Sequence, residues 1–218
     1  MKFHIPFTIS DIEKLKKKPK IFKLLIRHKK KSKIQYYLDN SDVNIDREEY
    51  LNIVFISFSI YFIVLSVILT TMLALLNVKL FFVFGPVIAL LFSIFVSFSQ
   101  LIYPRIYSLR KERDIEKNLL PALEDMLVQL TSGIPLFSIL VNISSSDYGV
   151  LSNEFKKAVK KINTGLPQIE ALEELGEQNP SIFFRRALWQ ISNGMKTGSD
   201  ISIVINDTIK SLNEEQLI

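Results

Sequence analysis

Two long uncharged stretches dominate the pattern of apolar and polar positions, and they lie close together in the first half of the chain. Residues 51–76 carry no charge, and their only amide is Asn52, at the edge. Three residues later, residues 80–103 form a second uncharged stretch. A helix of 26 residues is about 39 Å long, which exceeds the ~30 Å of a hydrocarbon core. The pattern therefore predicts two transmembrane helices joined by a tight turn.

Gly85-Pro86 lies inside the second stretch. Proline leaves backbone groups of a helix without their hydrogen bonds, and in a membrane helix neighbouring groups can bond to them. We therefore expect a kinked helix. The alternative is a helix that begins after Pro86, with residues 81–84 in the interface. A secretory signal peptide does not fit, because the apolar run begins near residue 50 and is longer than the core of such a signal.

Residues 104–218 show the spacing of amphipathic helices, with apolar positions at i, i+3 and i+4, and no convincing strand alternation. Glycine followed by proline, as in Gly133/Pro135 and Gly165/Pro167, is typical of one helix ending and the next beginning. We expect helices over residues 105–131, 135–143, 150–163, 167–178, 181–196 and 201–217. Short connections make neighbours antiparallel, so these residues predict a compact six-helix bundle in an all-α protein.

The predicted core draws on the first, third, fourth, fifth and sixth helices of this bundle. The first helix contributes a run of leucines around Leu123 and Met126, and the third contributes Phe155. The fifth helix carries Phe183, Phe184, Leu188, Trp189 and Ile191 as its apolar positions. Roughly 115 residues are enough to bury a core of ordinary size.

Charge decides the expected orientation in the membrane. Of 27 Lys and Arg residues, 13 precede Tyr50, against 7 acidic residues there. Basic residues flank the hairpin on both sides, within residues 29–33 and 105–113, whereas the turn carries only Lys79. The positive-inside rule therefore predicts both flanks and both termini in the cytoplasm. The expected domains are a basic cytoplasmic segment (1–50), a transmembrane hairpin (51–76 and 80–103) and a cytoplasmic helical domain (104–218).

The basic segment at residues 14–33 has two interpretations. Its apolar centre, with Phe22 and Leu24, suits an amphipathic helix on anionic lipid or on a partner protein. The second interpretation, of equal weight, is a solvated basic face that only sets the orientation of the chain in the membrane. No aromatic platform or known motif accompanies the charge, so we expect no nucleic acid.

The candidate chemistry is sparse. His4 and His28 are far apart without an acidic ligand spaced to join them, and the chain has no cysteine, which excludes disulfides and cysteine-based metal sites. There is no glycine-rich phosphate loop and no histidine near a serine nucleophile. The pairs Glu124-Asp125 and Glu173-Glu174 point about 100° apart on a helix. We therefore expect no catalytic, cofactor or metal site, and no enzyme.

Three segments carry a family resemblance: SGIPLFSIL at residues 132–140, NTGLPQIEALEEL at 163–175 and NGMKTGSD at 193–200. Residues 115–218 resemble the cytoplasmic F domain of type II secretion systems, whose relatives include the platform proteins of type IV pilus, tight-adherence pilus and archaellum assembly machines. The preceding membrane pair suits the tight-adherence or archaeal branch. The resemblance implies a non-enzymatic, multi-pass platform in the inner (cytoplasmic) membrane.

In that family the cytoplasmic helical domains engage a hexameric assembly ATPase, and the membrane part contacts pilin-like subunits. We accordingly expect these partners, and a homo-oligomer. The alternative is a membrane-anchored helical adaptor or signalling module unrelated to secretion. Family members usually have further transmembrane helices after this domain, so we expect a truncated chain or a second polypeptide that supplies them.

Charged residues late in the chain are candidates for contact with a partner such as the ATPase. They lie on the acidic face of the fourth helix and on the fifth helix, together with the glycine after it: Glu173, Glu174, Arg185, Arg186, Lys196 and Gly198. The alternative is that the charges form solvated faces and that Gly198 is a helix stop.

Overall fold

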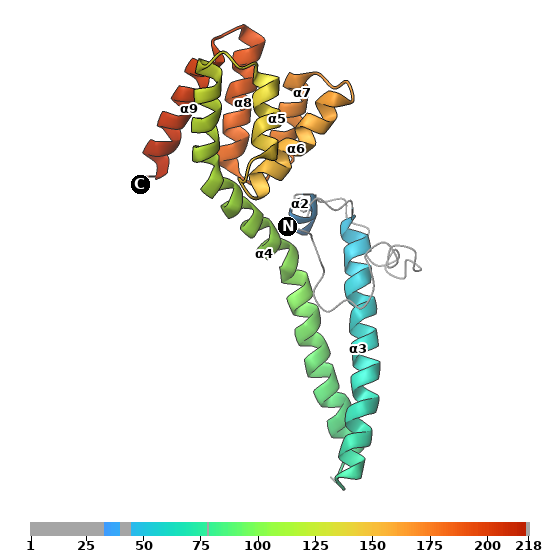
Figure 1. Cartoon of the computed structure of the whole chain (residues 1–218). Helices are drawn as coiled ribbons and strands as arrows, with labels where there is room; N and C mark the ends of the chain where they lie inside the picture. The colour runs from blue at the N-terminus through green and yellow to red at the C-terminus, as the bar shows by residue number, and fades with distance from the viewer. Residues whose placement is uncertain (1–32, 40–44, 78, 217–218) are drawn as a thin grey trace. The chain divides into compact units, whose positions relative to one another are not determined.

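The computed structural model describes residues 33–39, 45–77 and 79–216, and every regular element in them is a helix (Figure 1). The chain divides into two compact units, Lys2–Tyr107 and Ser108–Ile218, each described below by itself. The basic residues 14–32, His4 and His28 lie outside the described residues. The predicted all-α class is confirmed.

The first unit contains α2 (Lys33–Asp39), α3 (Arg47–Leu75) and the beginning of α4 (Phe81–Thr131). Both α3 and α4 are long and apolar enough to cross a membrane, as predicted. Only 17% of the most apolar window of α3 and 22% of that of α4 are buried, whereas the core helix of a soluble protein would be mostly covered. Their large exposed side chains, such as Ile63 and Phe95, need a hydrocarbon solvent.

The hairpin is held by close approach of α3 and α4, which lie side by side in Figure 1. A Cβ added to Gly85 would lie 2.5 Å from Thr70 Oγ1 and 2.9 Å from Thr70 Cα, so only glycine fits there. Ala89 and Ser93 continue the same buried line at four-residue spacing. Small residues at this spacing let two membrane helices pack backbone against backbone.

The hairpin is also closed at its basic flank. The Tyr50 hydroxyl donates to the backbone carbonyl of Gln100, with the two oxygens 2.5 Å apart. Tyr50 also belongs to a buried apolar cluster that contains Leu38 of α2 and Tyr107 of α4. Because α4 begins at Phe81 and runs through Gly85-Pro86, a helix starting after Pro86 is excluded.

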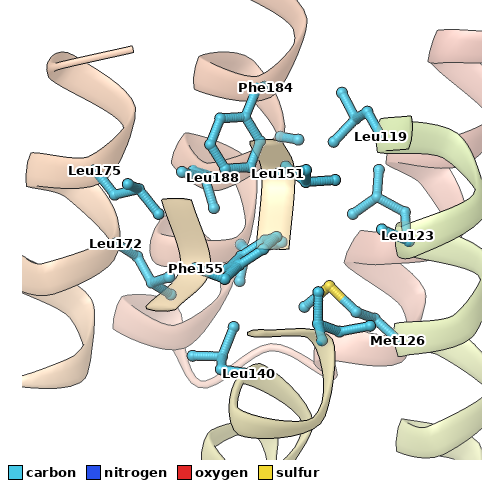
Figure 2. Close-up of a cluster of buried hydrophobic side chains, with 14 of the residues drawn as sticks. Leu119, Leu123, Met126, Leu140, Leu151, Phe155, Leu172, Leu175, Phe184 and Leu188 are labelled. Carbon is cyan, nitrogen blue, oxygen red and sulfur yellow. The ribbon is translucent and has the colours of Figure 1, made fainter. Parts of the chain in front are cut away.

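The second unit is the helical bundle. It contains the rest of α4, then α5 (Leu136–Ser145), α6 (Val150–Asn163), α7 (Gln168–Glu177), α8 (Ile182–Thr197) and α9 (Ile201–Gln216). Helices α5 to α9 agree with the second to sixth expected helices to within a few residues at each end. The first expected helix, residues 105–131, is instead the C-terminal part of α4, which begins at Phe81. In Figure 2, Phe155 and Phe184 meet at the centre among leucines from α4, α5, α6, α7 and α8. Their rings are edge to face, with centroids 5.4 Å apart.

The ends of α8 show why the helices stop where they do. The Ser181 hydroxyl accepts a hydrogen bond from the Phe184 N–H at 3.2 Å and so caps the first turn. Gly198 ends the helix with a φ of 69°, in the left-handed region that favours glycine. Asp200 Oδ1 then accepts from the Ser202 N–H at 2.8 Å and starts α9.

Candidate functional site

A groove of about 500 Å³ lies between α7 and α8. Buried Leu172 and Leu188 lie among its lining residues, together with two large apolar side chains that remain open to solvent. Those two are Ile182 and Trp189, 59% and 60% exposed respectively. A hydrophobic residue this exposed is ordinary when it stands alone, but here two of them line one hollow.

The opposite wall of the groove is α7, which contributes Gly176. A Cβ at Gly176 would lie 3.7 Å from the Cα, Cγ and backbone oxygen of Arg185 on α8, which is ordinary van der Waals contact. The helices therefore approach closely at this point without forcing a glycine there. The remaining lining residues are charged: Glu173 and Glu177 from α7, and Arg185 and Arg186 from α8.

Most of the charged residues around the groove are tied to neighbours. Glu173 Oε1 lies 2.6 Å from Lys196 Nζ, and Arg186 forms an ion pair with Glu215 of α9. Arg185 Nη2 donates to the backbone carbonyl of Asn179 at 2.9 Å. These surface pairs fix side-chain positions while contributing little stability.

The six residues predicted for partner contact separate into two groups. Glu173, Arg185 and Arg186 line the groove, and Lys196 joins them through its ion pair with Glu173. Glu174 is paired with Lys161 of α6 at 2.6 Å and does not line the groove, and Gly198 lies at the C-terminus of α8. The groove thus contains half of the predicted set.

Gly176, Ile182 and Trp189 also line the groove but were not predicted as site residues, whereas Glu177 belongs to the acidic helix face that was. The position of Trp189 could have been predicted from the sequence, because residues three and four apart share a face of a helix. Trp189 follows Arg185 by four residues and Arg186 by three, so the tryptophan was already placed on the charged side of the helix.

A buried polar network lies beside the groove. Lys111 of α4 is 1% exposed, and its Nζ lies 3.0 Å from Glu154 Oε1 of α6, which also pairs with Lys157 at 2.7 Å. Asn179 Nδ2 donates to Glu154 Oε2 at 3.4 Å. The sequence pattern placed Lys111 only among the basic residues that set orientation, but its burial gives it a structural role in the bundle.

The network continues into the turn before α8. The Ser181 N–H donates to Asn179 Oδ1 at 3.1 Å, and the Ser181 hydroxyl donates to Glu116 Oε1 at 3.0 Å. Since the Asn179 carbonyl also accepts from Arg185, these bonds connect the start of α8 to α4 and α6. The turn that precedes Ile182 is thereby fixed, and the groove wall with it.

Within the helical bundle, two groups outside the groove have shifted pKa values. Burial, and then the charge of Glu116, raise the pKa of Glu112 above its usual 4.5, with Arg113 acting in the opposite direction. Burial and the neighbouring Asp125 raise the pKa of Tyr148, whose hydroxyl donates to Asp125 Oδ2 at 3.2 Å. Within the described ranges, no three histidine or acidic side chains are placed to hold a metal ion.

Comparison with known proteins identifies the bundle. Residues 122–218 match the family model described as type II secretion system (T2SS), protein F, which covers the end of α4 and all of α5 to α9. No curated protein and no solved structure matches the chain. Residues 122–218 are therefore similar to protein F of the type II secretion system.

Proposed function

We propose that the chain is a non-enzymatic platform protein of a type II secretion or type IV pilus-like assembly machine, which couples a cytoplasmic hexameric ATPase to pilin-like subunits. The observation that carries the proposal is that a protein F domain follows two membrane-capable helices, and that the second of these, α4, continues into the domain as one helix. Such an arrangement gives one chain a membrane part and a helical part that can each bind a different partner.

The orientation in the membrane is part of the proposal. The short turn between α3 and α4 carries Lys79, whereas Arg105, Arg110 and Arg113 follow the second apolar stretch. The positive-inside rule favours the turn outside the cytoplasm and the bundle inside it, in an inner-membrane protein with both termini cytoplasmic. An ATP-driven partner would then reach the bundle directly. Anionic lipid at the basic N-terminal segment and self-assembly into a homo-oligomer remain predictions.

Co-purification tests the proposal. The full chain, solubilised in mild detergent, should retain the assembly ATPase expressed with it. A variant that lacks residues 108–218 keeps the unit that contains α2 and α3, and it should enter the membrane without retaining the ATPase. Failure of the full chain to associate in a reconstituted, complete machine would contradict the platform role.

A further inference from the structure

The exposed apolar residues of the groove lie together on one helix. Ile182 and Trp189 lie seven residues apart on α8, about two helical turns, and so share a face. Both line the same 500 Å³ hollow, with buried Leu172 and Leu188 beside them. A hollow of this size, with an open tryptophan on its wall, suits insertion of a large apolar side chain from outside.

Gly176 supplies an independent reason to expect an occupant. Its backbone is helical, and glycine in a helix costs about 1 kcal/mol relative to alanine. The nearest atoms to an added Cβ lie at 3.7 Å, so packing against α8 does not demand glycine at this position. The missing side chain instead keeps the α7 wall of the groove open to another backbone or side chain.

The charges on the two walls define the chemistry of that occupant. Glu177 on α7 is exposed and forms no ion pair with any described residue. Arg185 on α8 bonds to a carbonyl oxygen, and no carboxylate of the described chain neutralises it. A complementary partner would therefore carry an apolar strip. It would have a basic side chain at the edge that meets Glu177 and an acidic side chain at the edge that meets Arg185.

We propose that the α7–α8 groove binds an amphipathic helix of a cytoplasmic component of the assembly machine. The helix inserts an apolar anchor against Ile182 and Trp189, presents a basic residue to Glu177 and presents an acidic residue to Arg185. The mode is a helix in a groove, because the described residues of the bundle offer no strand edge to which a peptide strand could add. The inference rests on the proposed platform function and names the surface through which it operates.

A matched pair of substitutions tests the groove. Ile182→Ala removes an apolar side chain that lines the groove and is 59% exposed. Ile203→Ala removes one that is 60% exposed, lies on α9 and does not line the groove. The full chain in nanodiscs is titrated with the purified assembly ATPase. Loss of one buried isoleucine anchor should weaken binding about tenfold or more for Ile182→Ala, whereas Ile203→Ala should bind like the wild type.

The single tryptophan provides a second readout. Incorporation of 5-fluorotryptophan labels Trp189 alone, so one ¹⁹F resonance reports on the groove. The ATPase should shift that resonance in the wild type and in Ile203→Ala. Gly176→Leu, which fills the groove, should abolish the shift, whereas Gly176→Ala, for which the Cβ fits, should preserve it.

Each outcome decides one of the two proposals. If the wild type binds the ATPase and both isoleucine variants bind equally well, the groove is not the docking surface, while the platform function stands. If Ile182→Ala changes only the oligomeric state of the chain, the occupant is a second copy and the inference is overturned. If the wild type binds no component of the machine, the platform function fails and the inference fails with it.

Discussion

Replacing Glu154 with glutamine removes the negative charge at the centre of the buried network while it keeps the size of the side chain. Glu154 accepts from Lys111 at 3.0 Å and from Lys157 at 2.7 Å, but only Lys111 is buried. The substitution therefore removes the negative charge beside the Lys111 ammonium group, which solvent does not reach. Weakening the ion pair of a buried charge costs more than weakening that of an exposed one.

The magnitude follows from the distance and the surroundings. At 3.0 Å and an effective dielectric constant of about 20, the attraction between Lys111 and Glu154 is about 5–6 kcal/mol. Removal of one partner of a buried pair typically costs about 3–5 kcal/mol. Lys111→Met should cost less, about 1–2 kcal/mol, because Glu154 keeps Lys157 and the Asn179 amide.

Thermal unfolding of the full chain in detergent, followed through the helical signal of the bundle, measures these differences. For a domain of this size, a loss of 3 kcal/mol lowers the midpoint by roughly 10–15 °C. The double variant Lys111→Met/Glu154→Gln removes both charges and should recover most of that loss. Equal effects of the two single substitutions, or purely additive effects in the double variant, would refute the assignment of Lys111 as a buried charge that depends on Glu154.

Three further predictions concern other parts of the molecule. Gly198→Ala should destabilise the bundle by about 1 kcal/mol because φ is positive there, and Gly198→Asn should recover part of the loss. If both variants bind the ATPase as tightly as the wild type in the titration, a direct contact between Gly198 and that partner is excluded. Gly85→Leu should loosen the membrane hairpin, because the new side chain collides with the backbone of Thr70. The loosening should be detected as faster proteolysis in detergent, whereas Phe82→Ala, on the exposed face, should leave the hairpin intact. Glu112 binds its proton more tightly in the folded state than in the unfolded state, so its ionised form costs stability at neutral pH. Glu112→Gln should therefore raise the unfolding midpoint at pH 7, and the gain should vanish as the pH falls below 4.5; a gain that persists at low pH would contradict this sign.

The apolar patterns predicted the helices well because each one follows from local spacing. Gly165 and Gly198 end helices in the left-handed conformation, and the predicted bounds agree with α6 and α8 to within a residue. The continuity of α4 was harder to predict. Helix α4 contains Pro104 and Pro121 as well as Pro86, and proline normally predicts a break.

The site was only partly predictable, because its properties depend on which helices meet. Charge alone pointed to Arg185, Arg186 and Glu173, but it could not show that α7 and α8 leave a hollow between them. Periodicity placed Trp189 among the apolar positions of its helix, and only the packing of α8 reveals that its ring is open to solvent. Likewise, no local pattern marks Lys111 as buried, because its partner Glu154 lies 43 residues away on another helix.

The side of the membrane on which the bundle lies decides whether an ATP-driven partner can reach it. The chain has no cysteine, so single cysteines can be introduced without background: Asn77→Cys in the turn and Val128→Cys on the exposed surface of α4. A membrane-impermeant maleimide added to intact spheroplasts should label position 77 and leave position 128 unlabelled until the membrane is permeabilised. Labelling of position 128 in intact spheroplasts would place the protein F domain on the outer face and contradict the platform function.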